Sequence, residues 1–431
     1  MSNNAKNDIE RLEAPYKLPE GWKWQIACDI ANVYTGNSIN EKVKSEKYEG
    51  QTEGLNFIGT KDIDFDGSIN YANGVKINDF ENFKTAPANT PLLCIEGGSS
   101  GKKLGFTNEQ VCFGNKLCAF VSKEVEPKLI YYYLQTNFFY HSFMKERHGL
   151  IGGVSVGSIK QIPFPLPQNL TEQQRIVNCI ESMFAKLDEA KEKAQNVVDS
   201  FETRKAAILH QAFTGNLTAK WRKENDVLDD SWEEKTIGEC VKLYNGDRGK
   251  NYPNKNEYVL EGIPWINTGH ITETGYLNRE TMNYITVDKY NLLRSGKISQ
   301  GDMVFCLRGA TFGKIARVEP FEKGAIASSL VIIRPKKEVN REYIFLYLRS
   351  PFAKKELNKY ANGSAQPNLA AKDLAKYRIP IPSFLEQQEI VRILDTVLEK
   401  ESIAKNTAEQ VLEQIDLLKK SILARAFRGE L

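Results

Sequence analysis

The amino-acid sequence predicts an α+β protein with two similar mixed α/β globules, each followed by a long helix. Three observations lead to this prediction. The chain repeats itself, the ends of both repeats carry a heptad pattern of apolar residues, and the other parts are short apolar runs between turn residues. Composition agrees, since 41% hydrophobic and 26% charged residues are ordinary values for a globular protein.

The repeat is clearest at its end. Segment 172–217 aligns without a gap on segment 386–431, and both copies begin with EQQ. The first copy finishes with AFTGNL and the second with AFRGEL. Each copy follows a proline-spaced strand, IPFPLP at 162–167 and IPIP at 379–382.

The upstream parts repeat more loosely. GLNFIGTKDI at 54–63 matches GIPWINTGHI at 262–271. LLCIEGGSSGK at 92–102 matches VFCLRGATFGK at 304–314, with the Gly-Lys pairs aligned and one residue of slack. Several matches in the same order indicate a duplication, and the changing offset indicates insertions upstream of the helices.

The end segments predict two long helices. Apolar residues follow each other at alternating spacings of four and three, without internal Pro or Gly, and Gly215 and Gly429 come just after the last ones. Helices of about 43 residues would be about 65 Å long. Their stripes would be buried in a coiled coil between the two copies, or alternatively against another protein. The predicted seam residues are Ile176, Ile180, Met183, Leu187, Val197, Phe201, Ile390, Leu394, Val397, Val411, Ile415 and Ile422.

The remaining regions predict compact globules of about 150 residues. They hold short strands such as those within ANTPLLCIEGG and GDMVFCLRG, separated by Gly, Asn and Asp turns. The predicted parts are an arm at 1–20, globules at 21–168 and 229–382, helices at 169–217 and 383–431, and a polar linker at 218–228.

Charge and cysteine usage limit the class of protein. The net charge is only +3, which excludes a polybasic histone-like protein but allows local basic patches. Seven cysteines without a CxxC pair indicate free thiols in a reducing cytoplasm. The sequence has no run of 18 apolar residues and begins with a polar segment, so neither a membrane span nor a secretory signal is expected.

Motifs for catalysis are absent from the sequence. Gly97 to Gly101 and Gly309 to Gly313 resemble a phosphate loop, but each pair encloses three residues instead of four. The sequence has no Asn-Pro-Pro-Tyr or Asp-Pro-Pro-Tyr tetrapeptide for amino-methyl transfer, and its four histidines lack metal-ligand spacing. The chain is therefore expected to be no enzyme and to bind no metal.

Polar, Gly-rich loops with basic residues recur at matched positions and suggest nucleic-acid contacts. Arg and Lys suit guanine edges, Asn and Gln suit adenine, and Ser, Thr and Lys also serve phosphates. The candidate DNA-binding residues are Ser99, Ser100, Lys102, Lys103, Arg248, Lys250, Tyr252, Arg308, Thr311, Lys314, Gln366 and Asn368.

Together these features resemble the specificity subunit of type I restriction-modification systems. The resemblance rests on LPEGW at 18–22, the two IP-x-P segments before EQQ, and GSAQPNLAAKDL at 363–374. The helix endings AILHQAFTGNLTAKWR at 207–222 and SILARAFRGEL at 421–431 add to it. It extends from about Leu18 to Leu431.

The resemblance implies two target recognition domains, each reading one half of an asymmetric bipartite site in double-stranded DNA. It implies that the two helices pack antiparallel as a molecular ruler. Two methyltransferase subunits and two restriction-translocase subunits would complete a cytoplasmic, prokaryotic assembly for host defence. S-adenosylmethionine, ATP and Mg²⁺ would belong to those partners, so no cofactor is expected in this chain.

The first globule departs from the family pattern. GLIGGVSVGSIKQ at 149–161 stands where the second globule has NGSAQPNLAAKDL, so the amides of Gln366 and Asn368 have no counterpart there. This leaves Ser155 and Ser158 without a matched DNA-binding role.

Two other classes of function were considered. A stand-alone restriction-modification enzyme would need a methyltransferase or nuclease module, for which two globules and two helices leave no room. A structural coiled-coil scaffold with carbohydrate or protein ligands would lack the steep salt dependence of phosphate contacts. The duplication also predicts that one repeat, residues 1–217, can pair with a second copy of itself.

Overall fold

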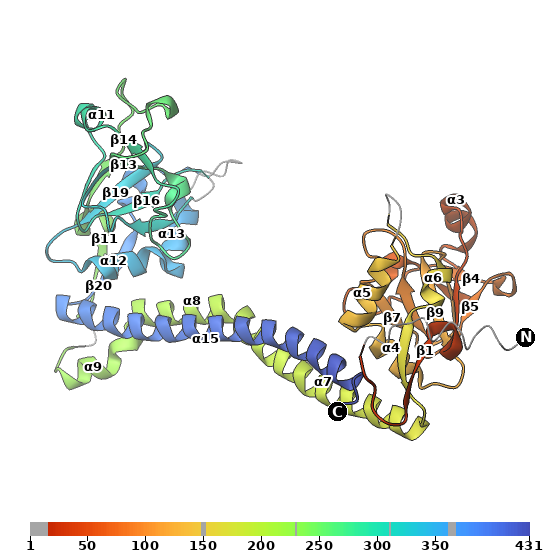
Figure 1. The fold of residues 1–431 in the computed structure, drawn as a ribbon. Helices are drawn as coiled ribbons and strands as arrows, with labels where there is room; N and C mark the ends of the chain where they lie inside the picture. Colours follow the sequence, from red (N-terminus) through yellow and green to blue (C-terminus); the bar gives the residue numbers. More distant parts are fainter. Residues whose placement is uncertain (1–15, 148–151, 229–230, 310–311, 361–367) are drawn as a thin grey trace, which may run out of the picture. The chain divides into compact units, whose positions relative to one another are not determined.

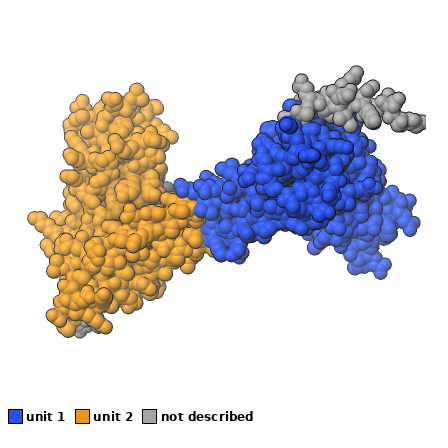
Figure 2. Space-filling model, turned by 60° about the horizontal axis from the view of Figure 1, so that its bottom comes forward, with its two compact units in different colours: residues 1–195, 409–431 blue, residues 196–408 orange. Residues whose placement is uncertain are grey.

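The structure, a computed structural model, describes residues 16–147, 152–228, 231–309, 312–360 and 368–431. They form two compact units (Figure 2). Unit 1 consists of residues 1–195 and 409–431, and unit 2 of residues 196–408. Each repeat therefore contributes its globule to one unit and the end of its helix to the other.

Within the described residues, the first globule contains two four-stranded sheets and a two-stranded ribbon (Figure 1). The strand orders are β2-β9-β6-β7, β4-β3-β8-β5 and β1-β10. Only the pair of β3 with β8 is parallel. The strands are β1 (Trp22–Ile26), β2 (Ala31–Thr35), β3 (Leu55–Ile58), β4 (Lys76–Ile77), β5 (Thr85–Ala86), β6 (Pro91–Cys94), β7 (Leu104–Phe106), β8 (Val111–Phe113), β9 (Leu117–Ser122) and β10 (Pro163–Pro167). The helices and helical turns are α2 (Ala27–Ile30), α3 (Glu41–Val43), η1 (Lys44–Tyr48), η2 (Thr60–Asp62), η3 (Phe80–Asn82), α4 (Pro127–Tyr133), α5 (Asn137–Lys145) and α6 (Val156–Lys160).

The second globule repeats this topology, which confirms the duplication predicted from the sequence. Its strand orders are β12-β19-β16-β17, β14-β13-β18-β15 and β11-β20, and again one pair, β13 with β18, is parallel. The strands are β11 (Glu233–Thr236), β12 (Val241–Asn245), β13 (Ile263–Ile266), β14 (Asn283–Ile285), β15 (Lys297–Ser299), β16 (Met303–Cys306), β17 (Ile315–Arg317), β18 (Lys323–Ile326), β19 (Leu330–Pro335) and β20 (Arg378–Ile381). The helices and helical turns are α10 (Ile237–Cys240), η5 (Lys255–Glu257), η6 (Thr268–His270), α11 (Val287–Leu292), α12 (Arg341–Leu348), α13 (Pro351–Tyr360) and α14 (Ala371–Leu374).

In unit 1, helix ends from both repeats complete the core of the first globule. Ile176 and Ile180 of α7 (Leu170–Asp199) and Leu423 of α15 (Phe384–Ala426) belong to the same buried cluster as the globule. The ring of Phe427, just after α15, lies 5.2 Å from that of Tyr133. The last turn of the second repeat is thus part of the first globule's core.

Unit 2 has the reciprocal arrangement. Leu209 and Phe213 of α8 (Phe201–Phe213) share a buried cluster with Ile390 and the second globule. The ring of Phe213 lies 5.2 Å from that of Tyr343, whose hydroxyl donates to the carbonyl oxygen of Pro380 at 2.6 Å. The apolar identities at the helix ends therefore anchor each helix in a globule as well as in a helix pair.

Within each unit the paired helix segments run antiparallel. In unit 1, Lys419 bonds Asp188 at 2.5 Å and Lys191 lies 4.0 Å from Asp416, so partner numbers fall as residue numbers rise. In unit 2, Arg204 bonds Glu401 at 2.8 Å, and Phe201 lies under the ammonium group of Lys405. All predicted seam residues are buried or half-buried.

The first predicted helix is broken, whereas α15 is a single helix of 43 residues. α7 ends at Asp199 and α8 begins at Phe201. The Ser200 hydroxyl donates to the carbonyl oxygen of Asn196, and Arg204 donates to that of Val197 at 3.2 Å. Side chains that bond backbone carbonyls in this way compete with the helical ladder and produce the break.

The segment predicted as a linker is structured and belongs to unit 2. It contains η4 (Asn216–Thr218) and α9 (Ala219–Glu224). The Arg222 guanidinium bonds Glu386 at 2.7 Å, and Thr218 donates to the same carboxylate oxygen at 2.6 Å. The side chains of Arg222 and Glu386 are 7% and 0% exposed, so a polar sequence here forms a buried ion pair.

Of the predicted N-terminal arm, residues 16–20 are described and contact unit 1. The Tyr16 hydroxyl donates to the carbonyl oxygen of Phe427 at 2.8 Å. Burial raises the pKa of Tyr16 to about 12. The arm therefore lies against the helix end that completes the first globule.

We predict that Glu386→Ala destabilises the chain by about 3–5 kcal/mol, because it leaves the Arg222 charge buried without its partner. The repeat supplies a matched control, since Glu172 aligns with Glu386 but bonds Arg175 at a half-exposed position. Glu172→Ala is expected to cost less than about 1 kcal/mol. Urea unfolding of both variants measures the difference, and equal losses would contradict the importance of the buried pair.

Candidate nucleic-acid interface

The two Gly-rich loops share one backbone conformation. Gly101 donates to the carbonyl oxygen of Cys94 at 2.8 Å, and Gly313 donates to that of Cys306 at 3.0 Å. Both glycines have positive φ, +73° and +80°, which L residues adopt at a cost. These amides bond the loop itself, so the glycines serve a tight turn, in agreement with the rejection of a phosphate loop.

The lysines of the two loops have different surroundings. The backbone hydrogen bonds show that Lys103, not Lys102, is the equivalent of Lys314 in the first globule. The carbonyl oxygen of Lys103 accepts from the N–H of Cys94, and that of Lys314 accepts from the N–H of Cys306. The Lys103 ammonium donates to the carbonyl oxygen of Thr60 at 3.2 Å. Within the described residues neither Lys102 nor Lys103 forms an ion pair with a carboxylate.

A neighbouring turn distinguishes the loops further. The turn 64–68 in the first globule corresponds to the turn 272–276 in the second, and each is closed by the same two backbone hydrogen bonds. Its second residue is Phe65, 71% exposed and 5.1 Å from the Lys103 ammonium. The corresponding residue is Glu273, which forms an ion pair with Lys314. The first loop thus presents a cation beside an exposed ring, and the second a neutralised pair.

A third segment joins each loop by a β-bridge. Glu96 pairs with Gly153 in the first globule, and Arg308 pairs with Asn368 in the second. The bridges confirm that Gly153 occupies the place of Asn368, so the first globule has no amide there. Ser155 instead caps α6, because its hydroxyl accepts from the backbone N–H of Ser158 at 3.0 Å.

The loop after β12 presents two of its candidates to solvent. Arg248 and Lys250 are exposed, whereas Tyr252 packs on Trp265 with ring centroids 5.2 Å apart. Asp247 organises the turn by accepting from the backbone N–H groups of Arg294 and Gly249. These hydrogen bonds, that of Arg294 first, lower the pKa of Asp247.

The other candidates differ in accessibility. Lys102 is exposed and Ser99 half-buried, but Ser100 is only 2% exposed. Thr311 and Gln366 lie outside the described residues. The structure thus brings Lys102, Lys103 and Ser99 together in one loop of unit 1. It brings Arg308, Lys314 and Asn368 together in unit 2.

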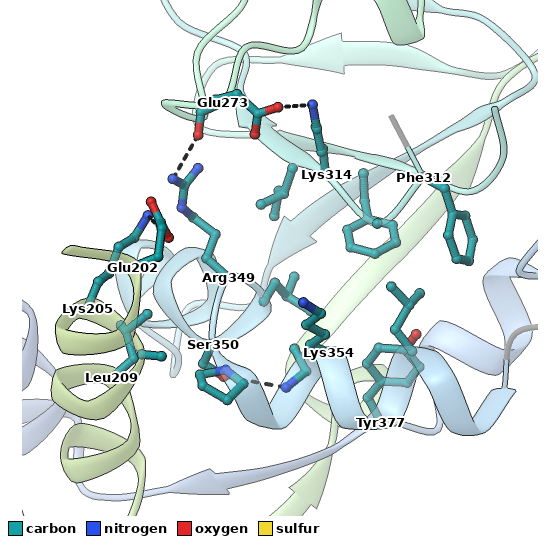
Figure 3. Close-up of a pocket in the computed structure, with 18 of the residues that line it drawn as sticks. Glu202, Lys205, Leu209, Glu273, Phe312, Lys314, Arg349, Ser350, Lys354 and Tyr377 are labelled. Atoms are coloured by element: carbon teal, nitrogen blue, oxygen red, sulfur yellow. Dashed lines mark hydrogen bonds and ion pairs between the residues drawn. The ribbon is translucent and has the colours of Figure 1, made fainter. Parts of the chain in front are cut away.

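A cavity of about 820 Å³ lies beside the second loop, within unit 2 (Figure 3). Figure 3 shows Lys314 and Arg349 both directed toward Glu273 at its edge. Arg349 donates to the carbonyl oxygen of Glu273 at 2.9 Å, and burial, followed by the nearby Arg317, lowers the pKa of Arg349. The charged lining residues are Glu202, Lys205, Glu273, Lys314, Arg349, Lys354 and Lys405. Cations exceed anions among these residues, so the lining of the cavity carries a net positive charge.

The described residues contain no group of three or more His, Cys, Asp or Glu side chains that could hold a metal ion. All seven cysteines are free thiols, and burial raises the pKa of Cys118 to about 12. None of the helices described combines the length and apolar character needed to cross a membrane.

Comparison with known proteins identifies the family. The model of the type I restriction modification DNA specificity domain matches residues 19–199 and again residues 229–414. The chain belongs to this specificity family. The two matches coincide with the two repeats, so each repeat is one copy of the family domain.

Two named relatives match this chain over almost its full length. It is 24% identical over 96% of its length to the type I restriction enzyme EcoKI specificity subunit of Escherichia coli K12, and covers 90% of that protein. It is 25% identical over its whole length to the EcoBI specificity subunit of Escherichia coli, and covers 91% of it.

Solved structures share the fold of the specificity-family chain. The HsdS subunit from Thermoanaerobacter tengcongensis superimposes with a TM-score of 0.65 at 18% identity, over 97% of this chain and all of that one. A chain from a study of complex assembly and conformational transition in the type I R-M system superimposes with a TM-score of 0.71 at 17% identity, again over 97% of this chain and all of that one. The architecture of two α+β globules and long helices is thus that of the family.

Sequence reasoning missed two residues that shape the loops of this specificity-family chain. Phe65 and Glu273 lie in turns that align in the repeat, GTKDIDFDGS at 59–68 and NTGHITETGY at 267–276. Their different side chains at one position were the available signal. The contact with the lysine loop depends on the fold and could not be read from the sequence.

Proposed function

We propose that the chain is the non-catalytic, sequence-specific DNA-binding subunit of a type I restriction-modification complex. Each globule would read one half of an asymmetric bipartite site. One observation carries this proposal: the same loop backbone presents Lys103 with Phe65 in one globule and Lys314 with Glu273 in the other. A shared frame with different side chains suits two different half-sites, and the family description and named relatives support the role.

The chemistry of the loops fits contacts to both backbone and bases. Exposed Lys102, Arg248 and Lys250 can bond phosphates, which position a protein on DNA. Asn368 is exposed beside Arg308, and Asn and Arg side chains suit adenine and guanine edges in the major groove. A net charge of only +3 is compatible with DNA binding because local basic groups in these loops can contact phosphates.

The antiparallel helices would set the distance between the half-sites. Both ends of each helix are anchored in globule cores, through Ile176 and Leu423 in unit 1 and through Leu209 and Ile390 in unit 2. An anchored helix has a fixed rise of about 1.5 Å per residue. Helix length would therefore determine which spacing between half-sites the chain can read.

Methylation and restriction would be carried out by partner subunits. We propose two methyltransferase subunits and two restriction-translocase subunits, with S-adenosylmethionine, ATP and Mg²⁺ bound by them. The sequence supports this division of labour, since it lacks the tetrapeptide for amino-methyl transfer and a phosphate loop. The chain would direct these activities by placing its partners on a chosen DNA sequence.

We predict that Lys103→Ala weakens target binding and reduces the slope of log K against log salt by about 0.9, because one phosphate contact is lost. Glu273→Gln is expected to strengthen binding and steepen the slope, since it removes the carboxylate that neutralises Lys314. The measurement is a salt series of DNA affinities for the complex with its methyltransferase. Lys193→Ala on the exposed face of α7 is the control, and slopes equal to that control would contradict a phosphate role for these loops.

We predict that seven residues inserted after Lys191 in α7, with seven inserted before Asp416 opposite them in α15, lengthen the spacing between half-sites. A heptad keeps the seam on the same face and adds about 10 Å, which is about three base pairs. Methylome sequencing of a host expressing the variant with its methyltransferase would show both half-site sequences unchanged. The insertion in α7 alone should abolish methylation, and an unaltered spacing with the matched insertions would overturn the ruler.

A further inference from the structure

In unit 2 a pair of facing side chains, one from each helix, forms an ion pair. In unit 2 the Arg204 guanidinium bonds the Glu401 carboxylate at 2.8 Å, and these side chains are 34% and 23% exposed. Arg204 also donates to the Ser200 hydroxyl and to the carbonyl oxygen of Val197. The guanidinium thus has three partners, which lie at the end of α7, at the break between α7 and α8, and on the facing turn of α15.

The corresponding pair in unit 1 is apolar. In the gap-free alignment of the repeats, Leu418 corresponds to Arg204 and Leu187 to Glu401. Because Arg204 and Glu401 bond each other in unit 2, the alignment of the repeats assigns Leu418 and Leu187 to facing positions in unit 1. Leu187 is half-buried and Leu418 is 49% exposed. Each unit therefore has a matched pair, ionic in one and apolar in the other.

Pairing of like repeats would mismatch both positions. If segment 195–217 of a second chain replaced segment 409–431 in unit 1, its Arg204 would face Leu187. If two second repeats paired, Glu401 would face Leu418. The neighbouring contact does not discriminate, because Lys205 would take the place of Lys419 opposite Asp188.

We propose that Arg204 and Glu401 make the two repeats of one chain pair with each other and disfavour pairing with a second copy. A charged group in a helix seam loses its ion pair when an apolar residue faces it, and polar seam residues select partners in this way. The mismatch occurs twice in a dimer of like repeats, so the factor by which it lowers the association constant is squared. The duplication alone predicts that residues 1–217 can pair with their own copy, and under this proposal the charged pair disfavours that pairing.

Single substitutions in the full chain reproduce each mismatch in place. Glu401→Leu leaves Arg204 facing leucine, as in a dimer of first repeats. Arg204→Leu leaves Glu401 facing leucine, as in a dimer of second repeats. The double substitution copies the apolar pair of unit 1. We expect both single variants to lower the folding equilibrium constant, with a coupling between the sites of about tenfold.

Arg204→Leu should be the more harmful substitution, because it also removes the bonds to Ser200 and Val197. The control is a double-mutant cycle at Glu189 and Lys193, which form an exposed pair within α7. Its expected coupling is below about twofold. The measurement is urea unfolding of the four full-length chains at each pair. A coupling at Arg204 and Glu401 no larger than that of the control would overturn the proposal.

A second measurement reports partner choice itself. A protease site placed after Leu228, which is 74% exposed, allows the folded chain to be cut between its repeats. Two preparations with different tags on the first half are cut, mixed in moderate urea and returned to buffer. First halves carrying different tags should copurify at least about tenfold more with the double leucine variant than with the natural chain. Equal recovery from both chains would contradict selection by the charged pair, whatever the unfolding cycle gives.

Discussion

The structure depends on an exchange of helix ends between the repeats. Phe427, at the end of the second repeat, packs on Tyr133 in the first globule, and Phe213, at the end of the first repeat, packs on Tyr343 in the second. Neither globule has a closed core without the other repeat. This explains why the helix ends are the most similar parts of the duplication, since each must fit a cavity of the same shape.

The exchange leaves the loops free to differ. The central strands PLLC and MVFC are fully buried in both sheets, and Gly101 and Gly313 close the following loops with the same hydrogen bond. Side chains at the outer surface of this frame contribute little to the core. The exchange of Phe65 for Glu273, or of Gly153 for Asn368, between the two globules therefore alters the loop surface without altering the fold.

The sequence predicted those features that follow from periodicity and repetition. The heptads predicted the apolar stripe along which the helices pair, and Gly215 and Gly429 predicted the helix ends. The aligned EQQ motifs predicted the duplication. Features that depend on single long-range contacts were not predictable. The break at Ser200 requires Arg204 to bond a backbone carbonyl, and the helix in the expected linker requires Arg222 to meet Glu386. The ion pair of Lys314 was likewise not predictable, because the nearest charged residue on either side of it in the sequence is basic and its carboxylate partner, Glu273, lies 41 residues away.

Duplication creates a problem of partner choice, because identical repeats pair equally well within and between chains. Under the proposed function the chain needs one copy of each globule, which requires pairing that favours unlike repeats. Small differences at facing positions can produce this preference for unlike repeats, since every mismatch occurs twice in a dimer of like repeats. Leu187 with Leu418 and Arg204 with Glu401 are such differences. The same divergence that gives the globules different loops thus extends into the helices, where it keeps the two different loops in one molecule.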